Sequence, residues 1–310
     1  MPRPSVSHHP PSQPPLPLAD RREDGLRPAA LSAWWLAALL TLPLWGCSSA
    51  PSQPPSAQQA LAKASSERGA RALRRGDLPQ AQAQYQAALN AAVALQDPAL
   101  AGAVRLNLTL VASRLGDVRG AHAQVDQILQ APQFYPPAWQ AQAAARKALL
   151  LLDSATPASA RPWIDAAQAG CDAPCAMAAM LTNLRAHLLL EQGEPALAMA
   201  QAAAAAALAL ASQQGSEQAT ALRLQARAGA RMGQTEAALT ALTQALVIDR
   251  QRGQPEPLAL TLVLLADLYT QRDQVDLAID HYQRAIDVYT AIGDARQADL
   301  LRQRLSPAPR

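Results

Sequence analysis

The segment GQTEAALTALTQA, residues 233–245, contains both the turn and the helical face that decide the fold of this chain. After an opening glycine, small or apolar residues follow at Ala238, Leu242 and Ala245. The spacing i, i+4, i+7 places these three residues on one face of an α-helix. Glycine is favoured at the end of the preceding helix, because only glycine enters the left-handed cap conformation without penalty. The segment therefore predicts a turn between two helices.

The same pattern recurs along the chain with a period close to forty residues. The turn signals are Gly76-Asp77, Gly116-Asp117, Gly193-Glu194, Gly233-Gln234 and Asp273-Gln274, the last with glycine replaced. The alanines that open the faces are Ala81, Ala121, Ala160, Ala198, Ala238 and Ala278, at spacings of 40, 39, 38, 40 and 40, with a weaker copy at Ala160. A regular period indicates stacked supersecondary units that bury each other's apolar faces.

Each face has a middle residue and a closing residue in addition to its opening alanine. The middle residues are Tyr85, Val125, Ile164, Ala202, Leu242 and Tyr282. The closing residues are Ala88, Ile128, Ala167, Ala205, Ala245 and Ala285. Small residues at the ends allow close packing against the preceding helix, and a larger middle residue fills the gap between them.

The composition favours helices throughout. Half of the 310 residues are hydrophobic, yet only 4% are aromatic and Phe134 is the single phenylalanine. Alanine and leucine supply the apolar surface, and both are strong helix formers. β-branched residues are sparse and no long alternating run occurs, so strands fit poorly. The sequence predicts an all-α fold.

The charge pattern argues against a nucleic-acid partner. The net charge is +3, but charged residues make up only 16% of the chain and the basic ones are mixed with acidic ones. A nucleic-acid-binding surface requires a concentrated basic stripe with aromatic stacking residues. The sequence shows no such combination.

The turn and the three-residue face resemble the second half of the tetratricopeptide repeat. Gly69 and Tyr269 match positions in the first half of that repeat, where most copies here have another residue. The resemblance covers roughly residues 57–305 and is weakest at 133–170, where one turn has extra residues. It implies a solenoid of about six helical hairpins with a capping helix at its end. The period of 40, against roughly 34 in common members, implies longer helices.

The amino-terminal region is predicted to be a targeting segment, residues 1–46. Residues 31–45 contain no charged residue, and this run is shorter than the ~20 residues that a membrane span requires. Arg27 precedes the run and Gly46 follows it, as in a secretory signal peptide. Because the region before the run is unusually long, we expect translation to start near Leu26 instead.

The end of this segment resembles the lipobox of bacterial lipoproteins. Leu44, Gly46 and Cys47 match that pattern, whereas Trp45 departs from it. The resemblance implies that Cys47 is lipidated, and two or three acyl chains give stable membrane anchoring. Ser48 implies sorting to the outer membrane, with the protein facing the periplasm. The alternative is a plain signal anchor in which Cys47 is a chance thiol.

The mature chain is then expected to have two parts. Residues 47–58 comprise the lipidated cysteine and a Pro/Ser-rich tether, of which residues 48–58 would reach roughly 30 Å when extended. Residues 59–306 form the solenoid, and residues 295–305 form its capping helix.

No catalytic or metal-binding motif is recognisable. The five histidines are His8, His9, His122, His187 and His281, and none has a second histidine at ligand spacing on one helix. The sequence contains no His-Glu-x-x-His run, phosphate-binding loop, nucleophile elbow or dinucleotide fingerprint. We therefore predict a non-enzymatic protein without catalytic residues, metal or cofactor.

Cys171 and Cys175 are the remaining cysteines, and in an exported protein they are expected to form a disulfide. The loop between them is too short for a large gain in chain entropy, so the bond would stiffen it locally. Metal binding by two thiolates alone and a redox role, which usually has two intervening residues, are the alternatives. Asp172 is expected to cap the helix that follows.

The resemblance implies that the first helix of each hairpin lines a concave groove. Counting back from the turns predicts the peptide-binding residues Asn183, His187, Arg223, Arg227, Arg231, Asp267 and Gln271, together with Ser113 and Arg114 of the second repeat. Such polar groups suit an acidic or extended peptide, through charge-assisted hydrogen bonds. The alternative is an ordinary solvated surface on which Arg227 pairs with Asp267.

The predicted function is that of an outer-membrane-anchored adaptor that binds another envelope protein or peptide. Type IV pilus pilotins are lipoproteins built of six such repeats, and their plan is similar. Adaptors of peptidoglycan hydrolases and outer-membrane assembly lipoproteins are further possibilities by resemblance. A structural protein that self-assembles through the alanine-rich residues 201–211 is the hypothesis from another class.

Overall fold

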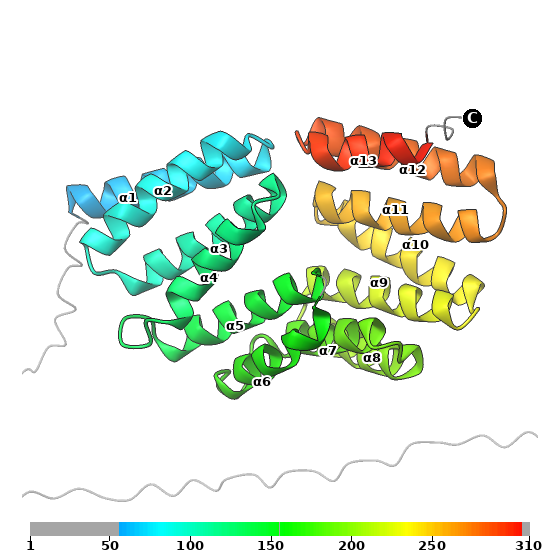
Figure 1. The fold of residues 1–310 in the computed structure, drawn as a ribbon, viewed down its shortest axis with the longest axis horizontal. Coiled ribbons are helices and arrows are strands. Elements are labelled where there is room, and N and C mark those ends of the chain that lie inside the picture. The colour runs from blue at the N-terminus through cyan, green and yellow to red at the C-terminus, as the bar shows by residue number, and fades with distance from the viewer. Residues whose placement is uncertain (1–55, 155, 306–310) are drawn as a thin grey trace, which may run out of the picture. The chain divides into compact units, whose positions relative to one another are not determined.

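The structure, a computed structural model, describes residues 56–154 and 156–305. The predicted signal peptide, Cys47 and most of the tether lie outside these residues. The described residues form α-helices and one short 3₁₀-helix, without a strand, as Figure 1 shows. The prediction of an all-α fold is confirmed.

The helices form six consecutive hairpins followed by one further helix (Figure 1). In chain order the hairpins are α1 (Ala57–Arg74) with α2 (Leu78–Ala94), α3 (Pro98–Leu115) with α4 (Val118–Leu129), α5 (Pro137–Leu152) with α6 (Arg161–Ala169), α7 (Ala178–Glu191) with α8 (Pro195–Ala211), α9 (Gly215–Arg231) with α10 (Thr235–Gln251), and α11 (Pro255–Gln271) with α12 (Val275–Ala291). The last helix, α13 (Ala295–Leu305), packs against α12. The described residues thus form an α-solenoid of the tetratricopeptide type.

The predicted turns end the first helices of the hairpins. Gly76, Gly116, Gly193 and Gly233 all have positive φ values, between 73° and 78°. Asp273 occupies the same place in the last hairpin with a φ of 55°. Proline also lies where it is tolerated, because Pro195 is the first residue of α8 and has no N–H to leave unpaired.

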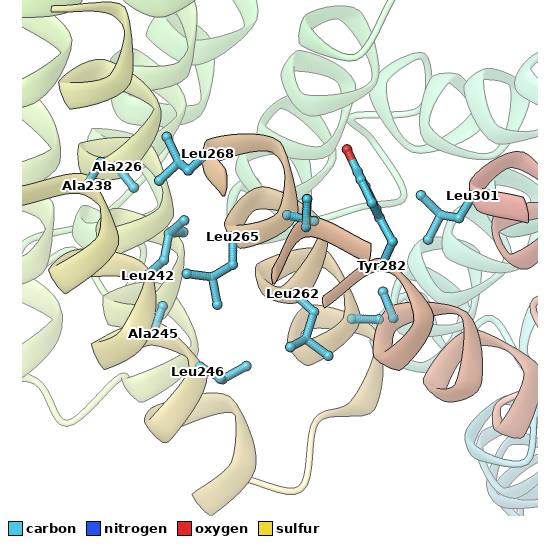
Figure 2. Close-up of a cluster of buried hydrophobic side chains, with 14 of the residues drawn as sticks. Ala226, Ala238, Leu242, Ala245, Leu246, Leu262, Leu265, Leu268, Tyr282 and Leu301 are labelled. Atoms are coloured by element: carbon cyan, nitrogen blue, oxygen red, sulfur yellow. The ribbon is translucent and has the colours of Figure 1, made fainter. Parts of the chain in front are cut away.

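The repeated faces of the second helices form the core. All eighteen residues predicted for these faces are buried, and Tyr282 is the most exposed of them at 8%. In the last two hairpins, Leu242 of α10 and Tyr282 of α12 pack with leucines of α11 such as Leu262 and Leu265 (Figure 2). Leu301 of α13 packs beside Tyr282, so the last helix covers the end of this cluster as predicted.

The third hairpin departs from the regular plan at its turn, as the weak resemblance there predicted. A 3₁₀-helix, η1 (Pro157–Ala160), lies between α5 and α6. The buried residues Ala160, Ile164 and Ala167 nevertheless keep the repeated face. The extra turn residues therefore change the connection and preserve the packing.

The prediction that Asp172 caps a helix is wrong. Helix α7 begins only at Ala178, its N-cap residue is Met177, and no side chain caps it. A disulfide joins Cys171 to Cys175, whose Cα atoms lie 5.4 Å apart. Pro174 disfavours helical geometry in the residue before it, and together with the closed loop it delays the start of the helix.

Two contacts join early hairpins of the array to its last hairpin, although these lie far apart in the sequence. Arg114, at the end of α3, donates from Nε to Glu256 Oε1 of α11 over 3.1 Å. Gly76 lies so close to the backbone around Ile292 that a Cβ atom there would overlap the carbonyl oxygen of Ile292. The second and first hairpins therefore touch the sixth hairpin and the loop after it.

None of the described helices combines the length and the apolar character that crossing a lipid bilayer would require.

Candidate functional site

The first helices of the hairpins line a series of cavities, and we call this the inner surface. One of these cavities has a volume of about 690 Å³ and is lined by residues of α5, α7, α9, α11 and α13. Four of the predicted groove residues lie in it, namely His187, Arg223, Arg227 and Asp267. Three separate hairpins thus contribute polar side chains to one space.

The remaining predicted residues line neighbouring cavities. Arg231 and Gln271 share a cavity of about 170 Å³ with Arg227 and Asp267. Asn183 and His187 line one of about 270 Å³. Ser113 and Arg114 line another of about 490 Å³. All nine residues therefore lie on the inner surface, although no single cavity contains them all.

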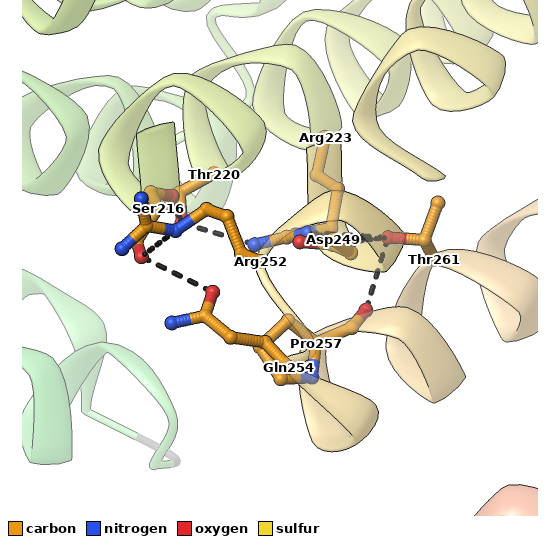
Figure 3. Close-up of polar contacts among 8 residues, drawn as sticks. All are labelled: Ser216, Thr220, Arg223, Asp249, Arg252, Gln254, Pro257 and Thr261. Carbon is orange, nitrogen blue, oxygen red and sulfur yellow. Dashed lines mark hydrogen bonds and ion pairs between the residues drawn. The ribbon is translucent and has the colours of Figure 1, made fainter. Parts of the chain in front are cut away.

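Arg223 differs from the others because its charge is already paired inside the protein (Figure 3). Its Nη1 atom donates to Asp249 Oδ2 over 2.8 Å and to Thr261 Oγ1 over 3.1 Å, and Nη2 donates to Thr220 Oγ1 over 3.0 Å. Thr261 also donates to Asp249 Oδ2, over 2.8 Å. Burial lowers the pKa of Arg223, and the Asp249 carboxylate opposes this effect.

This network joins three helices, because Arg223 comes from α9, Asp249 from α10 and Thr261 from α11. Removing one partner of a buried pair leaves the other charge uncompensated, which costs far more than the pair contributes. Asp249 is 1% exposed, and its Oδ1 atom accepts no hydrogen bond from the described residues. Arg223 is therefore held by the structure and is a poor candidate for direct contact with a partner.

Arg227 and Arg231 converge on one carboxylate, that of Glu191 at the end of α7. Arg227 Nη2 lies 2.8 Å from Glu191 Oε1, and Arg231 Nη2 lies 3.9 Å from the same atom. Arg231 also donates to the carbonyl oxygen of Leu190. The expectation that Arg227 pairs with Asp267 is wrong, because Glu191 of the preceding hairpin is the acid within reach.

Asp267 has other partners. It accepts a hydrogen bond from the Tyr282 hydroxyl, and Arg304 Nη1 lies 3.4 Å from its Oδ1 atom. Burial is the main cause of the raised pKa of Tyr282, and the hydrogen bond to Asp267 adds to it. Gln271, one turn further along α11, is exposed.

His187 is held uncharged near neutral pH. Its pKa is lowered to about 4, first by burial and then by the charge of Arg227, against the opposing effect of Glu191. Its Nε2 atom lies 3.6 Å from Glu191 Oε1. At neutral pH this imidazole therefore contributes a neutral donor and acceptor to both cavities that it lines.

Sequence reasoning missed several charged residues of the inner surface, among them Arg146, Glu191 and Glu217. Arg146 lies in α5. The turn after this helix contains extra residues, so the groove-facing positions of α5 could not be assigned by counting back from the turn. Glu191 lies two residues before the turn glycine Gly193. It comes close to an arginine of the next hairpin only because α7 packs against α9, which the sequence pattern does not show. The sequence did contain one signal for this pair, because an acidic residue stands about one repeat period, 36 residues, before Arg227.

The described residues contain no group of three or more histidine, cysteine, aspartate or glutamate side chains placed to hold a metal ion.

No family model matches the chain, and no curated protein matches it in sequence. Among solved structures, the apo form of RapI is similar with a TM-score of 0.62 and 10% identity, over 75% of this chain and 84% of that chain. PilF of Pseudomonas aeruginosa has a TM-score of 0.42 at 17% identity, over 66% and 90%. The TPR domain of P58(IPK) has a TM-score of 0.28 at 14% identity, over 79% of each chain. The likeness to RapI shows a shared helical fold, and the two lower scores support no argument.

Proposed function

We propose that the chain is a protein-binding scaffold whose inner surface holds a segment of another envelope protein. The observation that supports this most directly is the cavity of about 690 Å³, because polar side chains from three consecutive hairpins meet there. Arg227 and Arg231 remain 32% and 42% exposed in spite of their contact with Glu191. Among the described residues, the part-buried pair with Glu191 uses one of the five N–H donors of Arg227, so an acidic partner group can bind the other donors.

The experiment is site-directed crosslinking in intact cell envelopes. A photo-crosslinking amino acid at the exposed Gln271 is combined with Arg227→Glu and Arg231→Glu, and the matched control is Arg250→Glu on the outer helix α10. We expect one protein to crosslink to the parent and to the control, and to lose at least tenfold in yield with the double change. An unchanged yield, with folding verified by circular dichroism, would contradict the proposed groove.

The location in the envelope forms part of the same proposal. We infer that Cys47 bears the acyl chains and that the body faces the periplasm from the outer membrane, on the strength of the lipobox resemblance. Mass spectrometry of the amino-terminal peptide would detect the lipid, and Cys47→Ala should release the protein from membranes. Protein purified unlipidated, with Cys47 internal to the chain, would remove this assignment. A pilotin-like role in type IV pilus assembly is a narrower form of the proposal, favoured by the six hairpins.

A second candidate function is self-assembly through α8. Nine residues of this helix are exposed, all of them alanine or leucine, and the helix contains no charged residue. Leu197 and Leu210 are 55% and 65% exposed. Light scattering on residues 48–310 separates the two candidates, because self-assembly requires a mass above that of one chain whereas a groove-binding scaffold does not.

A further inference from the structure

The cavity of about 270 Å³ between α5, α7 and α9 has a composition unlike the rest of the inner surface. Its walls are mainly aliphatic, with Leu106, Leu149, Met180, Leu184 and Leu224, and the imidazole of His187 is the one ring among its lining side chains. Its volume lies just below the range of roughly 300–1,000 Å³ that is typical of small-molecule sites. It therefore suits a molecule smaller than a drug-sized ligand, with an aliphatic group.

One cation in this cavity lacks a partner. Arg146 of α5 forms no hydrogen bond or ion pair with any residue that the structure describes, although its guanidinium has five N–H donors. Burial lowers the pKa of Arg146, and the nearby charge of Glu217 opposes this without a hydrogen bond between them. Arg146 is half-buried and its N–H donors are unmatched among the described residues, so they can bind a carboxylate that enters the cavity.

The same cavity also offers unmatched acceptors, on Asn183 and Glu217. Asn183 donates from Nδ2 to the carbonyl oxygen of Glu217 over 3.0 Å and to Glu217 Oε2 over 2.9 Å. These two bonds determine which way the amide points, and they leave Asn183 Oδ1 buried without a partner. Glu217 Oε1 likewise accepts no hydrogen bond from the described residues. A positively charged donor such as an ammonium group would satisfy both oxygens.

We propose that this cavity binds a small zwitterion with an aliphatic side chain, that is, a free aliphatic α-amino acid. Its carboxylate lies against Arg146, its ammonium group against Glu217 and Asn183 Oδ1, and its side chain among the leucines and Met180. This site adjoins the surface proposed to bind a protein segment and shares His187 with it. Arg146 lines only the amino-acid site of these two, and Arg227 and Arg231 line only the other surface, so variants at these residues test the two proposals separately.

The requirement for both charges separates a free amino acid from a peptide segment. Within a chain, the carboxyl and amino groups are converted to amides and carry no charge. A chain terminus provides one of the two charges and leaves the other side of the cavity unmatched. The presence of one guanidinium and one carboxylate in the same mainly aliphatic cavity therefore favours the free molecule.

The test is calorimetric titration of residues 48–310 with L-leucine and two analogues that each lack one charge. The first analogue is 4-methylpentanoate, which lacks the ammonium group, and the second is 3-methylbutylamine, which lacks the carboxylate. We expect leucine to bind at least tenfold more tightly than either, because each analogue leaves one charged group of the cavity without a hydrogen-bonded partner. Equal affinities for the three compounds, or no heat with leucine at millimolar concentration, would overturn the proposal.

Two variants locate the binding. Arg146→Gln should weaken leucine binding about tenfold or more while leaving the affinity for 3-methylbutylamine unchanged, since that analogue has no carboxylate. Arg250→Gln, which lies on α10 and lines none of these cavities, is the matched control. Leucine binding that survives Arg146→Gln would place the amino acid elsewhere. If the Arg146 variant does not fold, the comparison of the three compounds on the unchanged protein still tests whether the cavity requires both charges.

Discussion

His187 shows at the residue scale how burial decides the protonation of one side chain. Its pKa of about 4 lies below the ordinary value of 6.5. The unfolded chain therefore takes up a proton as the pH falls through about 6.5, whereas the folded protein does so only near 4. The contribution of His187 to the free energy of unfolding is therefore fully present above pH 6.5, and it decreases as the pH falls towards 4.

We predict that His187→Gln flattens the pH dependence of stability between pH 7.5 and 4.5. The wild type should lose roughly 2–3 kcal/mol more than the variant over this range, from the difference between the two pKa values. Arg227, Glu191 and Arg231 act on the pKa of His187. The other charged groups in the two cavities that His187 lines are Arg146, Asp153, Glu217, Arg223, Asp267 and Arg304. All of them remain in the variant. Urea unfolding of both proteins at pH 7.5 and 4.5 measures this loss of unfolding free energy. Equal losses in the wild type and the variant would contradict the prediction.

At the scale of the element, close helix packing depends on small residues at particular places. Gly69 of α1 faces the buried ring of Tyr85 in α2, and a Cβ atom there would lie 2.9 Å from two ring carbons. Gly229 of α9 is also helical, but a Cβ atom there would meet its nearest atoms at 3.5 Å, an ordinary contact. The two glycines thus provide a matched pair.

We predict opposite effects for Gly69→Ala and Gly229→Ala. The first should destabilise the protein by about 1–3 kcal/mol, because the buried Tyr85 ring has to move. The second should be neutral or stabilise by up to about 1 kcal/mol, since alanine is the better helix former and fits. Thermal or urea unfolding of both variants checks this. Equal effects would show that the α1–α2 contact is looser than the structure indicates.

At the scale of the whole described array, contacts close in space join hairpins that are distant in sequence. Arg114 and Glu256 are 142 residues apart and share a hydrogen-bonded ion pair. The side chain of Arg114 is 18% exposed, and burial lowers its pKa. Both residues line the same cavity of the inner surface.

We predict that Arg114→Glu separates the second hairpin from the sixth. The change places two carboxylates together, and the radius of gyration of residues 48–310 in small-angle X-ray scattering should increase. The double change Arg114→Glu with Glu256→Arg restores opposite charges and should restore the radius. A radius that stays constant in the single variant would show that other contacts, such as Gly76 with Ile292, hold the hairpins together.

The sequence by itself determined the helices, the turns and the core faces. Each of these depends on local spacing, because a helical face at i, i+4, i+7 and a glycine at a left-handed cap act over a few residues. The predicted turn at Gly233 and the buried triad of Ala238, Leu242 and Ala245 follow directly from this. The start of α7 was mispredicted because a disulfide and a proline altered the local geometry.

Only the tertiary structure decided which polar side chains on the inner surface are already paired. Arg223, Arg227 and Arg231 follow one another at intervals of four residues along α9, and their spacing does not distinguish them. In the structure, Arg223 is buried against Asp249, whereas Arg227 and Arg231 reach Glu191. Arg146, which no periodic signal singled out, lacks a partner among the described residues. Pairing depends on distances of a few ångströms between different hairpins, and sequence spacing within one helix does not contain that information.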